Sequence, residues 1–123
     1  MHKIDDPNTP PEQTISFDEF RTVDIRVGRV VDASMLEGAR KPAIRMRIDF
    51  GDGVGVKNSS AQITQHYSPE DMIGRQVLAV VNFPPRQIGK FMSEALTLGV
   101  PDSNGDIFLI SPDNSTPNGA RLV

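Results

Sequence analysis

Residues 23–31 read VDIRVGRVV, and this stretch decides the fold of the chain. Apolar and charged residues alternate up to Gly28, a two-residue period that is typical of a β-strand with one buried face. Gly28 then interrupts the strand. A glycine at such a place often marks a bulge or a sharp bend, so we expect the bent strand that a small closed sheet requires.

Similar patterns predict further strands at 43–50, 54–57, 76–83, 93–100 and 106–110. Between the third and the fourth strand, Ser68 caps and Pro69 opens a helical turn that Gly74 ends. Short strands in this order, without a long helix, predict an all-β protein. We expect a five-stranded Greek-key OB-fold barrel with short helices and N- and C-terminal extensions. A β-sandwich or another small barrel would also fit the pattern.

A chain of 123 residues fits one domain. Residues 1–14 hold three prolines and several polar residues, and we expect a flexible N-terminal arm there. Residues 15–123 would form the OB-fold domain. At its start, Ser16 and Glu19 have the spacing of a capping box. This spacing predicts a short helix, and its phenylalanine side, which includes Phe17, would plug one end of the barrel.

The composition argues against catalysis. The chain has no cysteine and only two histidines, which excludes disulfides, thiolate nucleophiles and metal sites rich in cysteine or histidine. It has no Walker-type phosphate loop, and no histidine or lysine is placed to activate Ser59 or Ser60. We therefore expect a protein that is not an enzyme and that uses no metal and no cofactor.

The chain shows no targeting signal. No apolar run follows its first residue, and none approaches the length that spans a bilayer. We expect no signal peptide, no membrane insertion and a cytoplasmic location.

The net charge of −3 hides two basic segments. Residues 21–47 carry seven basic residues against three acidic ones, and residues 75–93 carry three basic residues and no acidic one. The local field, rather than the net charge, attracts a charged partner.

Each basic segment contains one loop between expected strands. Arg40 and Lys41 lie in the first loop, and Arg86 and Lys90 follow two prolines in the second, which the prolines should hold extended and rigid. In an OB barrel these two loops flank the ligand face. We expect them to converge there and to bind phosphates and unstacked bases. Two ordinary hairpin loops would explain the sequence equally well.

Five strings occur in a fixed order along the chain: VDIRVG (23–28), RKPA (40–43), IDFG (48–51), KNSSAQIT (57–64) and VVNFPPR (80–86). Together they resemble the CsaA-type secretion chaperones. Those chaperones belong to the tRNA-binding-domain family, which also includes the C-terminal domain of bacterial methionyl-tRNA synthetases. The resemblance runs from about residue 17 to the C-terminus, and several motifs in register are more specific than any one of them.

The resemblance implies a homodimer that binds tRNA. It also implies a chaperone that binds unfolded peptides or preproteins and assists protein secretion with the export machinery. A structure-specific tRNA-binding module, or a cofactor of tRNA aminoacylation, is the alternative. The resemblance and the basic loops together indicate these binding residues: Arg40, Lys41, Asn82, Arg86, Lys90 and Ser93. Pro84 and Gln87 stand where the broader family often has lysines. Fewer cations release fewer counterions and weaken RNA binding, which favours the chaperone branch.

A peptide would need a partly apolar groove. Phe83, Ile88, Phe91 and Met92 would line it, although core packing would suit the same residues. A barrel this small also leaves edge strands and apolar surface to cover. The helix that carries Phe17 and the C-terminal residues 122–123 are the expected cover in a dimer.

Overall fold

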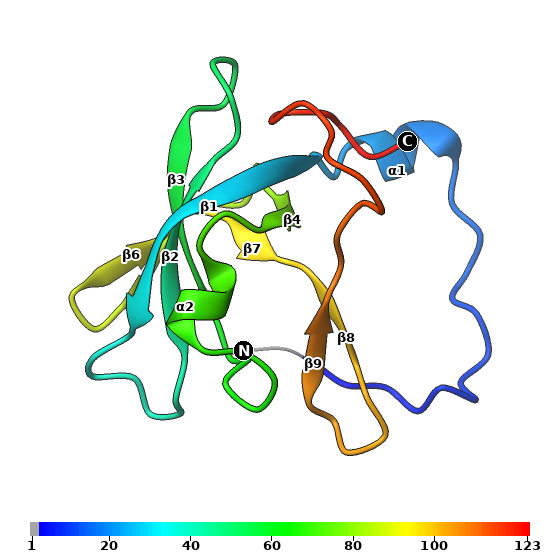
Figure 1. Ribbon diagram of the computed structural model, residues 1–123. Helices are drawn as coiled ribbons and strands as arrows, with labels where there is room; N and C mark the ends of the chain where they lie inside the picture. Colours follow the sequence, from blue (N-terminus) through cyan, green and yellow to red (C-terminus); the bar gives the residue numbers. More distant parts are fainter. Residues whose placement is uncertain (1–2) are drawn as a thin grey trace.

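The computed structural model describes residues 3–123, and its centre is one antiparallel sheet of five strands that curls on itself (Figure 1). The strand order is β3-β2-β1-β4-β7. The bounds are β1 Ile25–Met35, β2 Ile44–Asp49, β3 Val56–Ala61, β4 Gln76–Val80 and β7 Leu96–Thr97.

The edge strands of this sheet are β3 and β7, and the residues just before β7 lie against β3. The backbone N–H groups of Glu94 and Ala95 donate to the carbonyl of Asn58 at 2.8 and 3.1 Å. The buried hydroxyl of Ser59 donates to the carbonyl of Ala95 at 2.7 Å. These bonds nearly close the sheet, and the expected OB-type barrel is confirmed.

Strand β1 bends because it pairs with two partners. Its first half, from Ile25, pairs with β4, and its second half, up to Met35, pairs with β2. The register shift lies between Val30 and Asp32, slightly beyond the expected position at Gly28. Gly28 is needed for a different reason. A Cβ atom there would lie 2.5 Å from the Ile48 side chain and 2.6 Å from the Phe50 ring.

The core follows the strand patterns. In β2, Ile44, Met46 and Ile48 are buried while Arg45 and Arg47 are exposed. Every residue of β4 is buried, as its continuous apolar run predicts for a central strand.

Two short helices flank the barrel, and the structure corrects the role expected for the first. Helix α1, Phe17–Arg21, has the predicted capping box, with Glu19 N–H donating to Ser16 Oγ at 3.0 Å. It buries no residue, and Phe17 is 71% exposed. The plug instead comes from helix α2, Pro69–Met72, which packs on β1 and buries Met72 completely. A Phe17 plug was therefore the wrong prediction, because a capping box fixes where a helix begins but not what it covers.

Two hairpins extend from the barrel. The loop after Asn82 was expected to be a single loop held extended by its prolines, but residues 86–93 form a hairpin of their own from strands β5, Arg86–Ile88, and β6, Phe91–Ser93. The two prolines, Pro84 and Pro85, lie directly before the first strand of this hairpin. Strands β8, Gly99–Pro101, and β9, Ile107–Leu109, form the second hairpin. The expected strand at 93–100 is divided among β6, β7 and β8. These three strands pair with different partners, β5, β4 and β9 respectively.

The N-terminal arm runs past the β8–β9 hairpin and around one side of the barrel before it reaches α1 (Figure 1). From residue 3 to residue 16 it forms neither helix nor strand. Within residues 3–123, no helix combines the length and apolar character needed to cross a bilayer.

Candidate functional site

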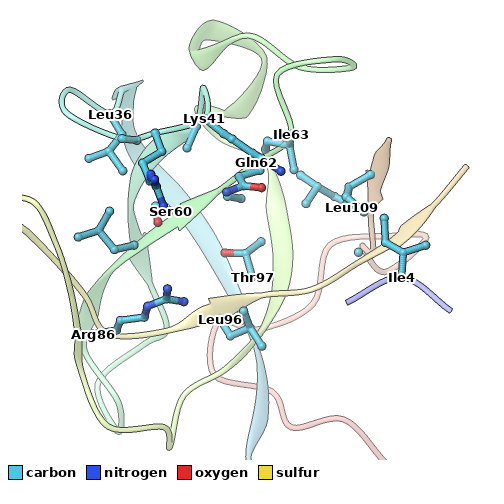
Figure 2. A pocket seen from close by; sticks show the side chains of 17 residues that line it. Ile4, Leu36, Lys41, Ser60, Gln62, Ile63, Arg86, Leu96, Thr97 and Leu109 are labelled. Carbon is cyan, nitrogen blue, oxygen red and sulfur yellow. The ribbon is translucent and has the colours of Figure 1, made fainter. Parts of the chain in front are cut away.

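A cavity of about 530 Å³ opens on one side of the barrel (Figure 2). Arg40 and Lys41 reach it from the loop between β1 and β2, and Arg86 reaches it from β5. The structure thus brings together the two basic loops, which are more than forty residues apart in the sequence. Figure 2 shows Lys41 and Arg86 on different sides of the same opening.

The rest of this cavity has a polar floor and an apolar end. Ser60, Gln62 and Thr97 provide polar side chains from β3, the residue after it and β7. The apolar end is formed by Ile4, Ile63, Ile107 and Leu109. Sequence reasoning did not identify this end, because its residues come from three separate segments: the N-terminal arm, the chain after β3, and β9. Ser60 and Gln62 lie within the string KNSSAQIT, which carries part of the family resemblance, but they were not among the expected binding residues.

A second cavity of about 390 Å³ adjoins the first. The two share Ser60, Arg86, Ile88 and Leu96. Phe83, which is 53% exposed, gives the second cavity an aromatic wall. The cavities therefore form one continuous surface that carries both cations and apolar side chains.

Two residues of the expected peptide groove lie elsewhere. Phe83 and Ile88 line the second cavity, but Phe91 and Met92 line neither. Phe91 is half-buried, and Met92 is 40% exposed on the β5–β6 hairpin.

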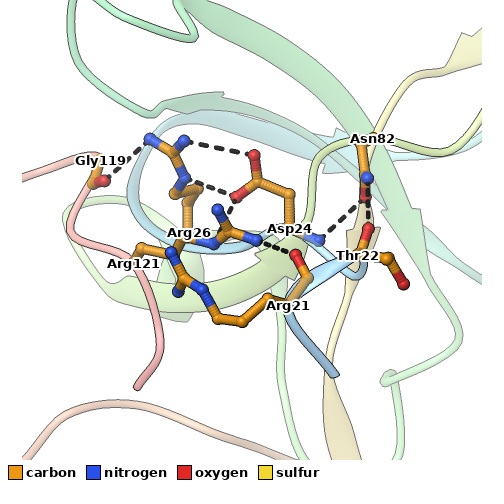
Figure 3. Close-up of polar contacts among 7 residues, drawn as sticks. All are labelled: Arg21, Thr22, Asp24, Arg26, Asn82, Gly119 and Arg121. Carbon is orange, nitrogen blue, oxygen red and sulfur yellow. Dashed lines mark hydrogen bonds and ion pairs between the residues drawn. The ribbon is translucent and has the colours of Figure 1, made fainter. Parts of the chain in front are cut away.

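The remaining expected binding residues are divided as well. Ser93 lines the second cavity. Lys90, in the turn of the β5–β6 hairpin, lines neither cavity. Asn82 uses its side chain within the fold. Its amide Nδ2 donates to the carbonyl of Thr22 at 2.9 Å, and its Oδ1 accepts from the N–H of Asp24 at 3.0 Å (Figure 3). Asn82 thereby fixes the start of β1.

The cations at the cavity are available to a ligand. Among residues 3–123, the ion pairs involve Arg26, Arg121 and His66, and none involves Arg40, Lys41 or Arg86. The outer face of the sheet extends this positive surface. Arg45 lies directly opposite Ser60 across β2 and β3 and is exposed, and its Nε donates to Ser34 Oγ at 2.6 Å. Surfaces with unpaired cations beside a cavity concentrate anionic partners.

A cluster of three side chains, His66, Asp102 and Phe108, holds the β8–β9 hairpin against the barrel. His66 Nε2 lies 2.7 Å from Asp102 Oδ2, and its ring stacks on Phe108 with centroids 4.0 Å apart. The hydrogen bond from His66 lowers the pKa of the Asp102 carboxyl, and the backbone N–H groups of Asp106 and Asn104 add to this effect. Asp106 brings a third side chain of the kind that binds metals within 4.8 Å of the other two. In its present geometry the group works as a clamp.

Ser59, considered above as a nucleophile, is engaged in closing the barrel. Its Oγ lies 2.7 Å from the carbonyl oxygen of Ala95 and 2.8 Å from Thr97 Oγ1. A buried hydroxyl with these partners has no base to accept its proton.

Comparisons with known proteins agree with this architecture. Residues 25–121 match the model of the family described as "Putative tRNA binding domain". The crystal structure of chaperone CsaA from Bacillus anthracis is 49% identical, with a TM-score of 0.82, and the match covers 90% of this chain and 100% of that chain. The CsaA chaperone protein from Picrophilus torridus is 44% identical with a TM-score of 0.82, over 89% and 100% of the two chains.

A longer relative matches over a small part of its length. Methionine–tRNA ligase of Porphyromonas gingivalis is 34% identical over 113 residues, which are 92% of this chain but 16% of the ligase. The chain spans about a sixth of the length of the curated relatives of this kind.

Proposed function

Because the chain belongs to the tRNA-binding domain family and is CsaA-like, we propose that its cavity face binds tRNA and also receives unfolded peptides or preproteins for export. One observation supports this most directly: Arg40, Lys41 and Arg86 line one cavity without an ion-pair partner among the described residues. As a tRNA-binding protein, it would work in the cytoplasm.

The mode of tRNA binding follows from the kind of contact available. Three cations at an open cavity suit phosphate groups and fix the position of the RNA without reading its sequence. The polar floor of Ser60, Gln62 and Thr97 can exchange hydrogen bonds with a ribose or an unpaired base. We therefore expect recognition of shape and backbone, without strong preference for one tRNA.

The test is binding of bulk tRNA over a range of salt concentrations. Three phosphate contacts give a slope of log K against log salt of about −2 to −3. Arg86→Ala and Lys41→Ala should each reduce this slope by about one and weaken binding by about 1.5 kcal/mol. Lys90→Ala is the matched variant within the same hairpin and should have a smaller effect, because Lys90 lines neither cavity. Binding that is insensitive to salt would contradict the proposal.

Peptide binding is supported by the second cavity. Phe83 and Leu96 are 53% and 42% exposed, and apolar side chains left open in a cavity offer burial to an unfolded chain. The test is suppression of client aggregation without ATP. Because the cavities share Arg86 and Ile88, bulk tRNA should displace a bound peptide, whereas simultaneous binding would exclude a common face.

The aminoacylation alternative depends on another protein. This chain corresponds to a small part of the methionine–tRNA ligases, so any such role would require a partner that carries the catalytic part. Binding of a ligase to this chain in the presence of tRNA would support that role over export.

We also propose a homodimer through the end of the barrel that carries α1 and the C-terminal residues (Figure 1). Residues 15–17 and 122–123 expose Ile15, Phe17 and Val123, the last fully. The tail is fixed beside α1, since Arg121 donates to the carbonyl of Arg21 (Figure 3) and the N–H of Leu122 donates to the carbonyl of Ile25 at 2.9 Å. Burying these side chains against a second copy would remove apolar surface from water.

Light scattering at micromolar concentration tests this interface. We expect the mass of a dimer for the natural chain and that of a monomer for Phe17→Glu. Val100→Glu is the control, because Val100 is equally apolar and 53% exposed on another element. A monomeric natural chain would refute the dimer.

A further inference from the structure

The N-terminal arm contributes to the cavity although it lies outside the family match, which begins at residue 25. Ile4 lines the apolar end of the larger cavity, and Figure 2 shows it beside Leu109, on the side away from Arg86. The arm therefore shapes a ligand site that the matched family domain would otherwise form alone.

Ile4 packs on the turn of the β8–β9 hairpin, and this turn is held in place by hydrogen bonds. A Cβ atom added to Gly105 would lie 3.5 Å from Ile4 Cδ1, so Ile4 lies over the turn of the β8–β9 hairpin. Asp102 holds this turn, accepting from the N–H groups of Asn104 and Asp106 at 2.8 and 3.0 Å. His66 fastens the other oxygen of Asp102 to the barrel.

The arm itself is only weakly attached. Among the described residues, the hydrogen bonds made by residues 3–14 stay within the arm: Asn8 N–H donates to Asp6 Oδ1, and Thr9 N–H donates to the Asp6 carbonyl. Ile4 remains 47% exposed, and every residue from 3 to 14 is exposed. A segment with few buried contacts and no hydrogen bonds to its support opens at low free-energy cost.

The charge of the arm is opposite to that of the cavity. Residues 3–14 carry Asp5, Asp6 and Glu12 against Lys3, whereas the cavity carries three cations. Carboxylates next to Ile4 repel the phosphates that the cavity attracts, over distances of about 10 Å at moderate salt.

We infer that residues 3–14 form a displaceable strap, with Ile4 closing the apolar end of the cavity, and that an anionic ligand must move this strap to bind fully. The inference rests on the proposed ligand site but not on the identity of its ligand. A ligand that binds only the open state has an apparent affinity reduced by the open fraction. The strap thus lowers the apparent affinity of the cavity for its ligand, and only ligands that can displace the strap bind fully.

Two variants of the full chain test the strap. Ile4→Ala removes its contact with the hairpin, and Ile73→Ala is the control, an exposed isoleucine that lines neither cavity and lies outside the proposed dimer interface. At low salt, Ile4→Ala should bind bulk tRNA roughly three- to tenfold more tightly, which corresponds to an open fraction of about 10–30% in the natural chain. Ile73→Ala should bind as the natural chain does. Equal or weaker binding by Ile4→Ala would overturn the strap.

A second probe separates the strap from the tRNA proposal. Anilinonaphthalene sulfonate is both apolar and anionic, which matches the two ends of the cavity. Its fluorescence should rise with Ile4→Ala and not with Ile73→Ala. If this rise occurs while none of the proteins binds tRNA, the strap stands and the tRNA proposal fails. If all three proteins bind the dye equally, the strap inference fails, whatever they do with tRNA.

Discussion

Replacing Gly28 with alanine tests the packing that bends β1 around the core. The added Cβ would lie 2.5 Å from Ile48 Cγ2 and 2.6 and 2.7 Å from two atoms of the Phe50 ring. Carbon atoms pack at about 3.5–4.0 Å, so these neighbours must move by roughly 1 Å. Ile48 and Phe50 are 0% and 1% exposed, and a close-packed interior has little room for such a movement.

The expected cost can be estimated from these contacts. Overpacking of this kind costs about 1–3 kcal/mol, while the lower entropy of the unfolded alanine chain returns about 0.4–1 kcal/mol. We expect a net loss of about 1–2 kcal/mol in the free energy of unfolding. For a chain of this length, that loss lowers the Tm by roughly 3–8 °C.

Urea and thermal unfolding, followed by circular dichroism, measure the loss. Gly53→Ala is the matched control, because a Cβ there meets no atom within 4 Å and the residue does not have positive φ. It should leave stability unchanged or slightly raised. If Gly28→Ala lowers the free energy of unfolding by less than about 0.5 kcal/mol, well below the expected net loss of about 1–2 kcal/mol, the close contact of β1 with Phe50 does not exist as described.

Three further predictions concern the barrel seam, acid stability and the hairpin clamp. Ser59→Ala should lower the free energy of unfolding by about 1–3 kcal/mol in urea titrations, because it leaves the carbonyl of Ala95 without its buried donor; Ser103→Ala, on an exposed turn, should have no effect. The hydrogen bond from Arg26 lowers the pKa of Asp24 from 3.8, so this carboxylate stabilises the fold above about pH 4 and the contribution disappears as the pH falls through the lower folded-state pKa. Stability curves of the natural chain and Asp24→Asn should therefore converge in acid, and parallel curves down to pH 2 would contradict the assignment. His66→Ala should speed amide hydrogen exchange in β8 and β9 while leaving β4 protected, and unchanged exchange in both would show that His66 does not hold the hairpin.

The sequence determined the local elements of this protein. Ser16 with Glu19, and Ser68 with Pro69, place the starts of both helices, because capping depends only on residues a few positions apart. The alternation at 44–48 fixes the buried face of β2, since side chains of a strand point to opposite faces in turn. The order of these elements was sufficient to predict the barrel, and the basic loops were recognised from their charge.

The tertiary structure decided which segments meet. Alternation shows that a face is buried but not what covers it, so nothing local indicated that Met72 rather than Phe17 plugs the barrel. Asn82 was expected at the ligand face, yet both of its polar groups bond the backbone around residue 22, a contact set by the closure of the sheet. The apolar end of the cavity needs Ile4 beside Leu109, residues more than a hundred positions apart. Contacts at such separations depend on the register and curvature of the whole sheet, which only the folded chain defines.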